Sequence, residues 1–366
     1  MYKSFIVKNF RCFRDITIES IERVNLIAGK NNVGKTALLE AFWLHHGPNI
    51  PDLGRRVNTF RGLDQVDAKE LLYELFLDFD PDSRIELSSY GLWGENPRSL
   101  QIYLQERRSV EIPLGESPGG ELTTEEKSSV GIRASRNQIV FEYTDEYGKT
   151  FTSQGWVVER QVAPAIVELG FQSHQMPIGK RSSGIYLAAR HRPSGREDID
   201  RFSNIEVAGK QEEIVDILKR VDPNITRLSL IVRSGVPVLY ANIGGRRLVP
   251  VPLLGDGIGR LLSIALAIGN AQDGIVLIDE IENGLYHGVM GNVWKVIAAF
   301  ARQFNVQLFA TTHSEECIRS AHQAFEQDSQ YDFRLCRLER VEDIIRAVTY
   351  DKETLGAALE SGLEVR

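Results

Sequence analysis

Gly29-Lys30-Asn31-Asn32-Val33-Gly34-Lys35-Thr36 is the stretch from which the fold of this 366-residue chain is inferred. It has the pattern G-x-x-x-x-G-K-T, which is typical of the phosphate-binding loop of nucleotide hydrolases. The two glycines let the backbone turn tightly, so that successive N–H groups point inward at an anion. Lys35 adds a positive charge for the β and γ phosphates, and the Thr36 hydroxyl is suited to holding Mg²⁺. We therefore predict that all eight residues bind a nucleotide, that Lys35 also assists catalysis and that Thr36 also holds the metal.

The flanking sequence provides the strand and the helix that such a loop requires. Val24–Ala28 is a short apolar run, which predicts a buried strand, and Thr36–His46 is rich in good helix formers. Phosphates on the loop would lie at the N-terminus of that helix, where the helix dipole favours negative charge. The alternative is a Gly/Asn turn with an incidental lysine, and the strand–loop–helix context argues against it.

The composition is ordinary for a soluble globular protein, with 42% hydrophobic and 25% charged residues. The net charge of −7 excludes a bulk-electrostatic nucleic-acid binder, so any contact with DNA must come from a local patch. Cys12, Cys317 and Cys336 lack metal-ligand spacing, which indicates a reducing compartment without disulfides or a zinc site. We find no signal peptide and no apolar run of the roughly 18 residues that a membrane span needs. We therefore expect a cytoplasmic protein with no membrane partner.

Two carboxylates follow a second apolar strand. Gly274–Ile278 is apolar and is followed directly by Asp279 and Glu280. At the carboxyl end of a strand, an aspartate can hold Mg²⁺ through water and a glutamate can polarise an attacking water. Because this strand must meet the phosphate-binding loop in a parallel sheet, we predict Asp279 as a metal-site residue and Glu280 as a catalytic one.

A Gly-rich turn precedes the strongest amphipathic helix of the sequence. From Ile258 onward, apolar residues recur at i, i+3, i+4, i+7 and i+8, which predicts the helix. The turn contains Gly255, Asp256 and Gly257, whose N–H groups are open to an anion at the helix N-terminus. These three residues are further candidates for nucleotide binding, and an ordinary helix cap is the alternative.

Short alternating segments between Pro and Gly turns predict a mostly antiparallel sheet between residues 71 and 155. The expected strands are Leu71–Phe79, Ile85–Tyr90, Leu100–Leu104, Gln138–Tyr143 and Thr150–Thr152. Two earlier strands, around Phe5–Val7 and Ile16–Ile18, are expected to pair. A helix within 208–221 and a hairpin within 228–251 follow. Downstream we expect a helix over Val289–Gln303, a strand over Val306–Thr311, two strands over 333–338 and 344–350, and a helix from Thr354.

The segment before the phosphate-binding loop resembles the opening of the RecF, SMC and OLD (overcoming-lysogenisation-defect) ATPases, which belong to the ABC-type ATPases. Asn9-Phe10-Arg11-Cys12-Phe13 fits the Asn-Phe-Arg-x-Phe of that group. Asp279–His287 resembles its D-loop region, with Ile281 in place of a proline and Tyr286 in place of a histidine.

The resemblance implies roles for further residues. His313 follows the strand Val306–Thr311 and matches the switch histidine that contacts the γ-phosphate, so it is a catalytic candidate. Gly255–Gly257 corresponds to the signature loop that closes the site of the opposite subunit. The family usually has serine where this chain has Gly255, so backbone N–H groups must contribute more of the binding. Gln65 is the candidate for the glutamine that senses Mg²⁺ and the γ-phosphate, and a surface glutamine is the alternative.

The fold that the resemblance implies is α/β, a P-loop ABC-type ATPase head with a mixed central sheet, flanking helices and an antiparallel β-lobe. We expect one head over residues 1–366, with the nucleotide-binding core in 1–46 and 250–330 and a β-rich lobe with a helical insertion in 71–250. No heptad run appears between residues 47 and 250, which favours the compact OLD-like ATPases over those with a long coiled coil. No second set of catalytic carboxylates follows His313, so we expect no Toprim nuclease domain.

The implied function is hydrolysis of ATP to ADP and phosphate with ATP and Mg²⁺ bound between two heads. The expected partners are a second copy of the chain, or a higher oligomer, and a separately encoded effector such as a nuclease, in phage defence or DNA metabolism. One alternative is a nucleotide-gated scaffold with little turnover. Another is a RecF-like DNA-repair loader that binds DNA. The most basic stretch, Lys180–Arg201, could contact nucleic acid, although a solvated loop is the favoured interpretation.

Overall fold

A six-stranded mixed sheet forms the centre of the molecule. The computed structural model of the chain describes residues 1–47, 73–91, 96–106, 132–160, 166–173, 183–189 and 195–366. The sheet has the order β16-β15-β3-β14-β13-β9, in which only β16 runs antiparallel to its neighbour. Its strands are β3 (Val24–Ala28), β9 (Gly184–Leu187), β13 (Ile275–Ile278), β14 (Gln307–Thr311), β15 (Phe333–Val341) and β16 (Ile344–Tyr350).

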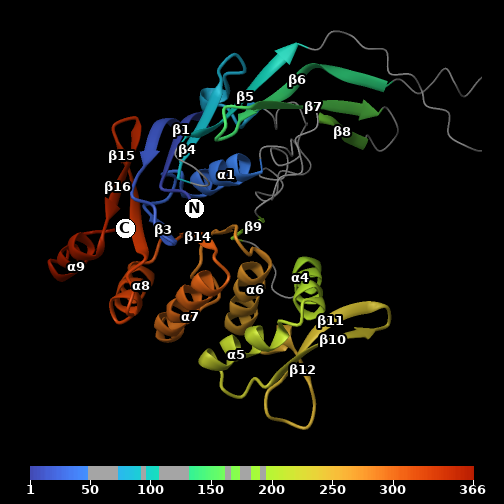
Figure 1. The fold of residues 1–366 in the computed structure, drawn as a ribbon, viewed down its shortest axis with the longest axis vertical. Helices are drawn as coiled ribbons and strands as arrows, with labels where there is room; N and C mark the ends of the chain where they lie inside the picture. The colour runs from blue at the N-terminus through green and yellow to red at the C-terminus, as the bar shows by residue number, and fades with distance from the viewer. Residues whose placement is uncertain (48–72, 92–95, 107–131, 161–165, 174–182, 190–194) are drawn as a thin grey trace, which may run out of the picture.

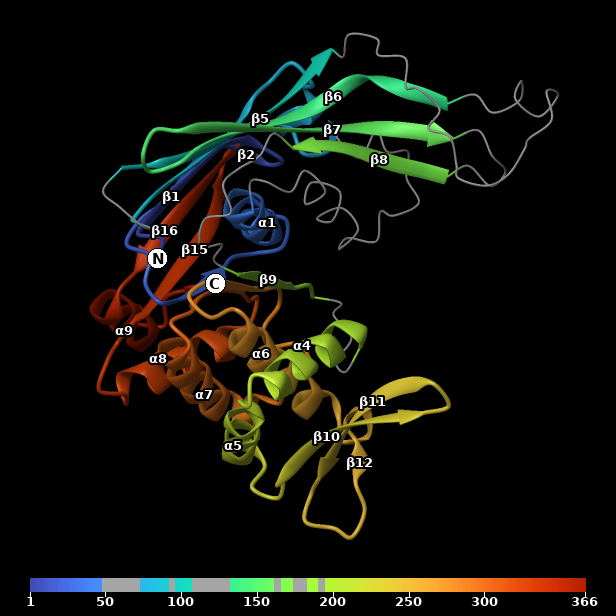
Figure 2. The ribbon, with the colours of Figure 1, turned by 45° about the vertical axis from the view of Figure 1, so that its right-hand side comes forward.

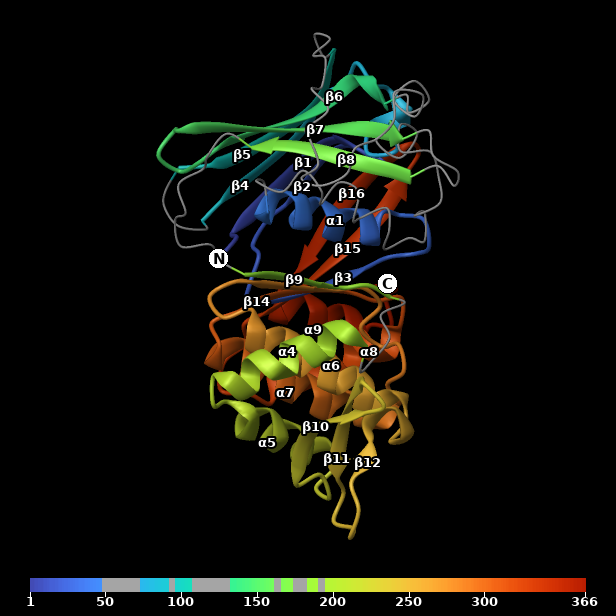
Figure 3. The same cartoon turned by 90° about the vertical axis from the view of Figure 1, so that its right-hand side faces the viewer.

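A seven-stranded antiparallel sheet with the order β2-β1-β4-β5-β6-β7-β8 forms a second layer. Its strands are β1 (Ser4–Phe10), β2 (Phe13–Ile18), β4 (Ile85–Tyr90), β5 (Arg98–Glu106), β6 (Ile132–Thr144), β7 (Thr150–Arg160) and β8 (Ile166–Ser173). Figure 3 shows this sheet above the central sheet, with helix α1 (Lys35–His46) between the two.

A column of stacked aromatic rings joins these layers. Phe42 of α1 stacks on Phe5 of β1 and on Phe309 of β14, with 4.1 Å between ring centroids in each pair. The neighbours of Phe309 on β14, Leu308 and Ala310, point to the opposite face and join the hydrophobic core beneath the sheet. Both faces of the strand are therefore buried, which is why the sequence of a parallel strand is a continuous apolar run.

Helices cover the other face of the central sheet, as Figures 1 and 2 show. They are α4 (Arg196–Val207), α5 (Gln211–Val221), α6 (Asp256–Asn270), α7 (Met290–Gln303), α8 (Glu315–Glu326) and α9 (Lys352–Glu360). A small sheet of β10 (Arg227–Arg233), β11 (Val236–Asn242) and β12 (Val249–Pro250) lies at the far end of this helical layer. Short 3-10 turns are η1 (Leu77–Phe79), η3 (Val251–Leu253) and η4 (His287–Val289). None of the described helices is long and apolar enough to cross a membrane.

The predicted α/β class, with a mixed central sheet, flanking helices and an antiparallel β-lobe, is confirmed. The sheets also show how the sequence is distributed between the two layers. β1 and β2 belong to the antiparallel sheet, although they lie within residues 1–46. β9, β15 and β16 belong to the central sheet, although they lie outside 1–46 and 250–330.

One predicted strand is wrong and several elements were not predicted. In the described part of Leu71–Phe79, Phe76 makes a single bridge to Phe10 and the chain then turns through η1. Asp78 and Phe79 have φ angles of 54° and 58°, which ends any extended backbone there. Strand β8 and helices α4 and α8 were not predicted, and β5, β6 and β7 are longer than the segments expected from alternation.

Candidate functional site

Three neighbouring parallel strands bring the predicted site residues to one edge of the central sheet. β14 lies between β3 and β13, with Thr311 opposite Ile27 and Ala310 opposite Ile278. The loops that follow these strands therefore emerge side by side, because the carboxyl ends of parallel strands share an edge. They carry the phosphate-binding loop, the pair Asp279 and Glu280, and His313.

The phosphate-binding loop depends on glycine at both ends. Gly34 has a φ of 88°, and a Cβ there would lie 2.6 Å from Cζ of Phe13 and 2.7 Å from Sγ of Cys12. Gly29 has a φ of 147°, and a Cβ there would lie 2.6 Å from the carbonyl oxygen of Leu338. Both conformations favour glycine, and neither position has room for a side chain.

The Asn9–Phe13 segment supports this loop from the β1–β2 turn. Phe13 and Cys12 pack against Gly34, as described above. Arg11 forms an ion pair with the buried Glu40 of α1, with 2.7 Å between Nε and Oε2. The turn is thereby attached both to the loop and to the helix that follows it.

The Lys35 side chain lies within the loop. Its ammonium group donates to the carbonyl oxygens of Gly29 and Lys30, at 2.7 and 2.9 Å. Burial lowers the pKa of Lys35, while the negative charges of Asp279, Glu280 and Glu282 act in the opposite direction. The cation is therefore held at the same edge as the carboxylates of the β13 loop.

Asp279 connects the phosphate-binding loop to β14. The Thr36 hydroxyl lies 3.1 and 3.0 Å from the two carboxylate oxygens of Asp279, and the Thr311 hydroxyl donates to Oδ1 at 2.6 Å. A hydroxyl and a carboxylate at this separation offer the oxygen ligands that Mg²⁺ prefers. The described residues contain no group of three or more His, Cys, Asp or Glu that could hold a metal. Mg²⁺ here would therefore use Thr36 and Asp279 together with oxygens of the nucleotide and of water.

Glu280 is held in a defined position by its neighbours. Its backbone has a φ of 48°, and its N–H donates to the Thr311 hydroxyl oxygen at 2.8 Å. The Asn283 amide donates to Oε2 of Glu280 at 2.7 Å. The buried Arg260 of α6 donates to the carbonyl oxygens of Asp279 and Glu280, at 2.9 and 3.3 Å. Both acids thus share Thr311 and Arg260 as supports.

His313 is linked to the same loop through Glu282. The imidazole Nδ1 lies 3.1 Å from Oε1 of Glu282, and the backbone N–H of His313 donates to that oxygen at 2.9 Å. The Thr312 hydroxyl also donates to it, at 2.8 Å. The His313 side chain is 52% exposed, so it remains accessible to a ligand at this edge.

The Gly255–Gly257 segment adjoins the loop after β13, with Gly255 and Asp256 exposed and Gly257 half-buried at the start of α6. Gly255 has a φ of 94° and precedes α6. A Cβ on Gly257 would lie 3.2 Å from the carbonyl oxygen of Gly284, and one on Gly284 would lie 3.3 Å from Cβ of Asp256. This turn therefore packs on the Asp279–His287 segment of its own chain. Gln65, the remaining metal candidate, lies outside the described residues.

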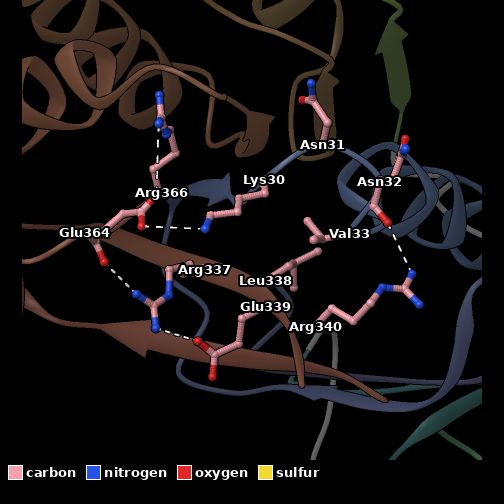
Figure 4. A pocket seen from close by; sticks show the side chains of 10 residues that line it. All are labelled: Lys30, Asn31, Asn32, Val33, Arg337, Leu338, Glu339, Arg340, Glu364 and Arg366. Atoms are coloured by element: carbon pink, nitrogen blue, oxygen red, sulfur yellow. Dashed lines mark hydrogen bonds and ion pairs between the residues drawn. The ribbon is translucent and has the colours of Figure 1, made fainter. Parts of the chain in front are cut away.

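A pocket of about 510 Å³ adjoins the phosphate-binding loop (Figure 4). Arg340 donates to the carbonyl oxygen of Asn32 at 3.3 Å. The Nζ atom of Lys30 forms an ion pair with Oε2 of Glu364 at 3.8 Å. Arg337 connects Glu339 to the backbone of Glu364. The lining residues are Lys30, Asn31, Asn32, Val33, Arg337, Leu338, Glu339, Arg340, Glu364 and Arg366.

Several residues that complete this arrangement were not predicted. Thr311 and Glu282 adjoin His313 and Glu280 in the sequence, so they could have been selected as neighbours of predicted residues. Asn283 lies within the segment that resembles a D-loop. Arg260 has no sequence signal beyond being a basic residue in a largely apolar helix, where a buried charge requires partners.

Comparison with known proteins finds a matching family profile and two relatives, one of them over nearly the whole chain. A family profile described as "AAA domain, putative AbiEii toxin, Type IV TA system" matches residues 24–319. An "ATP/GTP phosphatase" of Helicobacter pylori is 24% identical over 383 residues, which cover 97% of this chain and 97% of that protein. An uncharacterised protein of Methanocaldococcus jannaschii is 43% identical over 44 residues, 12% of this chain and 20% of that one.

Solved structures similar to this chain include SMC heads. One is an Smc head bound to the C-terminal winged-helix domain of ScpA, with 12% identity, a TM-score of 0.49, and coverage of 98% of this chain and 99% of that one. Another is the SMC head domain of Thermotoga maritima, with 13% identity and a TM-score of 0.45. The match covers 96% of this chain and 99% of that one.

Proposed function

The chain belongs to the family of AAA domains whose profile matches residues 24–319, and we propose that it is a Mg²⁺-dependent ATPase that hydrolyses ATP to ADP and phosphate. The observation that carries the proposal is the chain of hydrogen bonds from Thr36 through Asp279 and Thr311 to Glu280. It joins a phosphate-binding loop to a candidate general base across three adjacent strands. The name of the Helicobacter pylori relative, an ATP/GTP phosphatase, supports the same chemistry.

The residues at this edge suit an in-line attack of water on the γ-phosphorus. Glu280 accepts the proton of the attacking water, while the bond from the γ-phosphorus to the oxygen that bridges the β-phosphate breaks. Lys35 and the loop N–H groups stabilise the charge on the phosphates, and His313 contacts the γ-phosphate. Thr36 and Asp279 would hold Mg²⁺, which supplies charge neutralisation on the phosphate oxygens.

The pocket beside the loop supports a nucleotide ligand in addition to a bare phosphate. Its volume of about 510 Å³ lies in the range of small-molecule sites. Because Lys30, Asn31, Asn32 and Val33 line it, a ligand whose phosphates lie on the loop can place its nucleoside there.

We also propose that two heads close on ATP, with Gly255–Gly257 of one copy completing the site of the other. The exposure of this turn supports the proposal, since its N–H groups at the start of α6 are open to an anion. The biological setting that we propose is phage defence or DNA metabolism, with a separately encoded effector such as a nuclease. The description of the family as an AbiEii-like toxin of a type IV system is in line with a defence role.

A second candidate function is a nucleotide-gated scaffold with little turnover of its own. It is favoured by Gly255, because a glycine lacks the hydroxyl that would bind the γ-phosphate across the dimer. Turnover that rises sharply when a partner or DNA is added would favour the scaffold. Rapid turnover by the lone protein, unchanged by either, would exclude it.

The test is the substitution Glu280→Gln. We expect ATP turnover to fall by about 10² or more, because the general base is lost, and the affinity for Mg-ATP to stay within about twofold. Steady-state phosphate release and calorimetric ATP titration measure the two quantities. Glu19→Gln, at an exposed glutamate beyond the end of β2, is the matched control and should retain full activity. Full turnover by Glu280→Gln would refute the assignment.

A further inference from the structure

The small sheet at the end of the helical layer has a charge opposite to that of the whole protein. We define the wing as residues 219–250, which contain the C-terminal end of α5 and the strands β10, β11 and β12. The wing has six basic residues and one acidic residue, Asp222, for a net charge of +5 in a chain of −7. From Pro223 to Gly255 there is no Asp or Glu. The basic residues are Lys219, Arg220, Arg227, Arg233, Arg246 and Arg247.

The five wing arginines are exposed and have no acidic partner among the described residues. Two arginines in the helical layer, by contrast, form ion pairs with acidic residues. Arg201 of α4 pairs with Asp198 and Glu197, and Arg302 of α7 pairs with two aspartates. Lys219 is the exception within the wing, since it pairs with Asp216. Five unneutralised guanidinium groups, four on the small sheet and its loop and one at the end of α5, are free to bind an external anion.

The geometry of the wing suits a long ligand. The β10–β11 hairpin projects away from the helices in Figures 1 and 2, and β10 is an edge strand of its sheet. Arg227 and Arg233 are the first and last residues of β10 and point to the same face, so they stand about 20 Å apart along the strand. The Arg233 guanidinium also lies over the Tyr240 ring, 5.6 Å from its centroid, which restrains its position.

We propose that the wing binds the phosphate backbone of duplex nucleic acid. Guanidinium groups bind phosphate oxygens in pairs of hydrogen bonds, and a duplex presents such phosphates along a line of this length. A two-stranded β-ribbon also fits the major groove of B-DNA. The contacts that the arginines provide are to phosphates, so the binding is independent of base sequence.

This proposal does not rest on ATP hydrolysis, but the wing is connected to the candidate site. β12 continues through η3 directly into Gly255 and the start of α6. Leu228, Leu239 and Val251 belong to the same hydrophobic core as α6. The wing is therefore continuous, both along the chain and in the hydrophobic core, with the helix that carries Arg260.

The proposal is tested by measuring how tightly the 366-residue chain binds a fluorescent duplex of about 30 base pairs, without nucleotide. Fluorescence anisotropy gives the affinity at several salt concentrations between about 50 and 200 mM. The triple variant Arg233→Gln, Arg246→Gln, Arg247→Gln should bind at least about tenfold more weakly. Its plot of log K against log salt should be shallower by about 3, because each lost phosphate contact removes about 0.9. The double variant Arg246→Gln, Arg247→Gln changes only the exposed turn. Its plot of log K against log salt should be shallower than that of the wild type by about 2.

The control is Arg14→Gln, Arg84→Gln, Arg346→Gln, which removes the same charge from exposed positions on β2, directly before β4 and on β16. It should keep the wild-type affinity and slope. Equal losses in both triple variants would overturn the proposal, because overall charge would then explain the binding. Absence of duplex binding by the wild type would also overturn it, and so would binding only to poly-glutamate or to phosphatidylserine vesicles.

Discussion

At the scale of single residues, Gly34 in the candidate site and His45 in the core each have surroundings with a measurable consequence. Gly34 combines a φ of 88° with Cys12 and Phe13 at less than van der Waals distance from where a Cβ would lie. His45 lies outside the site, buried beneath the antiparallel sheet, with Nδ1 2.9 Å from the Tyr2 hydroxyl oxygen. The first shapes the phosphate-binding loop, and the second makes the stability of the protein depend on pH.

Gly34→Ala should cost about 2 kcal/mol or more of unfolding free energy and weaken ATP binding. The added methyl group is strained by the positive φ and also overlaps Phe13 and Cys12. Urea denaturation and ATP titration measure the two effects. Gly148→Ala is a matched control, because Gly148 has a φ of 76° but no atom within 4 Å of its Cβ position. It should cost only about 1 kcal/mol. Equal costs for both variants would contradict the steric argument.

His45 should make the protein less stable as the pH falls below about 6.5. Burial lowers the pKa of His45 from its ordinary value of 6.5 to about 3. Between these values the unfolded chain binds a proton that the folded one excludes, so stability is present above pH 6.5 and is lost progressively toward pH 3. The loss is about 1.4 kcal/mol per pH unit. The stability advantage of the wild type over His45→Gln should shrink at that rate in urea melts, and parallel curves would contradict the prediction.

Residues whose role follows from a local sequence pattern were predicted. Residues that reach the site only through contacts with distant parts of the chain were not. Asp279 and Glu280 were expected because two carboxylates follow an apolar strand. Thr311 was not, because its contact with Asp279 joins residues 32 positions apart in the chain. Arg260 was missed for the same reason, since its acceptors are backbone carbonyls of a distant loop.

At the scale of elements, hydrophobic periodicity identified the buried strands and most amphipathic helices. It failed where a few charged residues or a local turn decided the structure. β3, β13 and β14 are apolar on both faces, so each was visible as a continuous run. α4 was interpreted as part of a basic loop because Arg196 and Arg201 dominate its sequence, yet Phe202 and Ile205 bury one face of it. The strand predicted over Leu71–Phe79 failed because two positive φ angles end it.

Arg260→Met should uncouple α6 from the loop after β13. The methionine can fill the space of the side chain, but the carbonyl oxygens of Asp279 and Glu280 lose their donor. We expect kcat for ATP to fall by tenfold or more, with the Kd for ATP nearly unchanged, because Glu280 loses a support but the phosphate-binding loop does not. Lys295→Met, at an exposed position of α7, is the control. A raised Kd with an unchanged kcat would point to a role in binding instead.

At the scale of the whole molecule, the proposed dimer predicts that the Gly255–Gly257 turn lies at the contact between two copies. Two exposed apolar side chains flank it, with Leu253 75% exposed before it and Tyr286 66% exposed beyond Gly284. Leu253 and Tyr286 are therefore the side chains that we expect to contact the second copy in the dimer proposed above.

Native mass spectrometry of Glu280→Gln should show a doubled mass only when Mg-ATP is present. Closure then depends on ATP bound to Lys35 of one copy and Gly255–Gly257 of the other, and the variant cannot reopen by hydrolysis. Adding Tyr286→Ala should reduce the dimer fraction. Tyr147→Ala, at a tyrosine that is 84% exposed and lies outside this surface, should not. A mass that does not change with ATP would show that this turn does not close a partner's site.

The order of strands in the central sheet has a consequence for synthesis of the protein on the ribosome. β3, which carries the phosphate-binding loop, lies between β14 and β15, and the last of these begins at Phe333. At about 5–20 residues per second, the edges of β3 stay unpaired for roughly 15–60 s after it emerges. For that time an apolar strand, Val24–Ala28, is available to chaperones or to strands of other nascent chains.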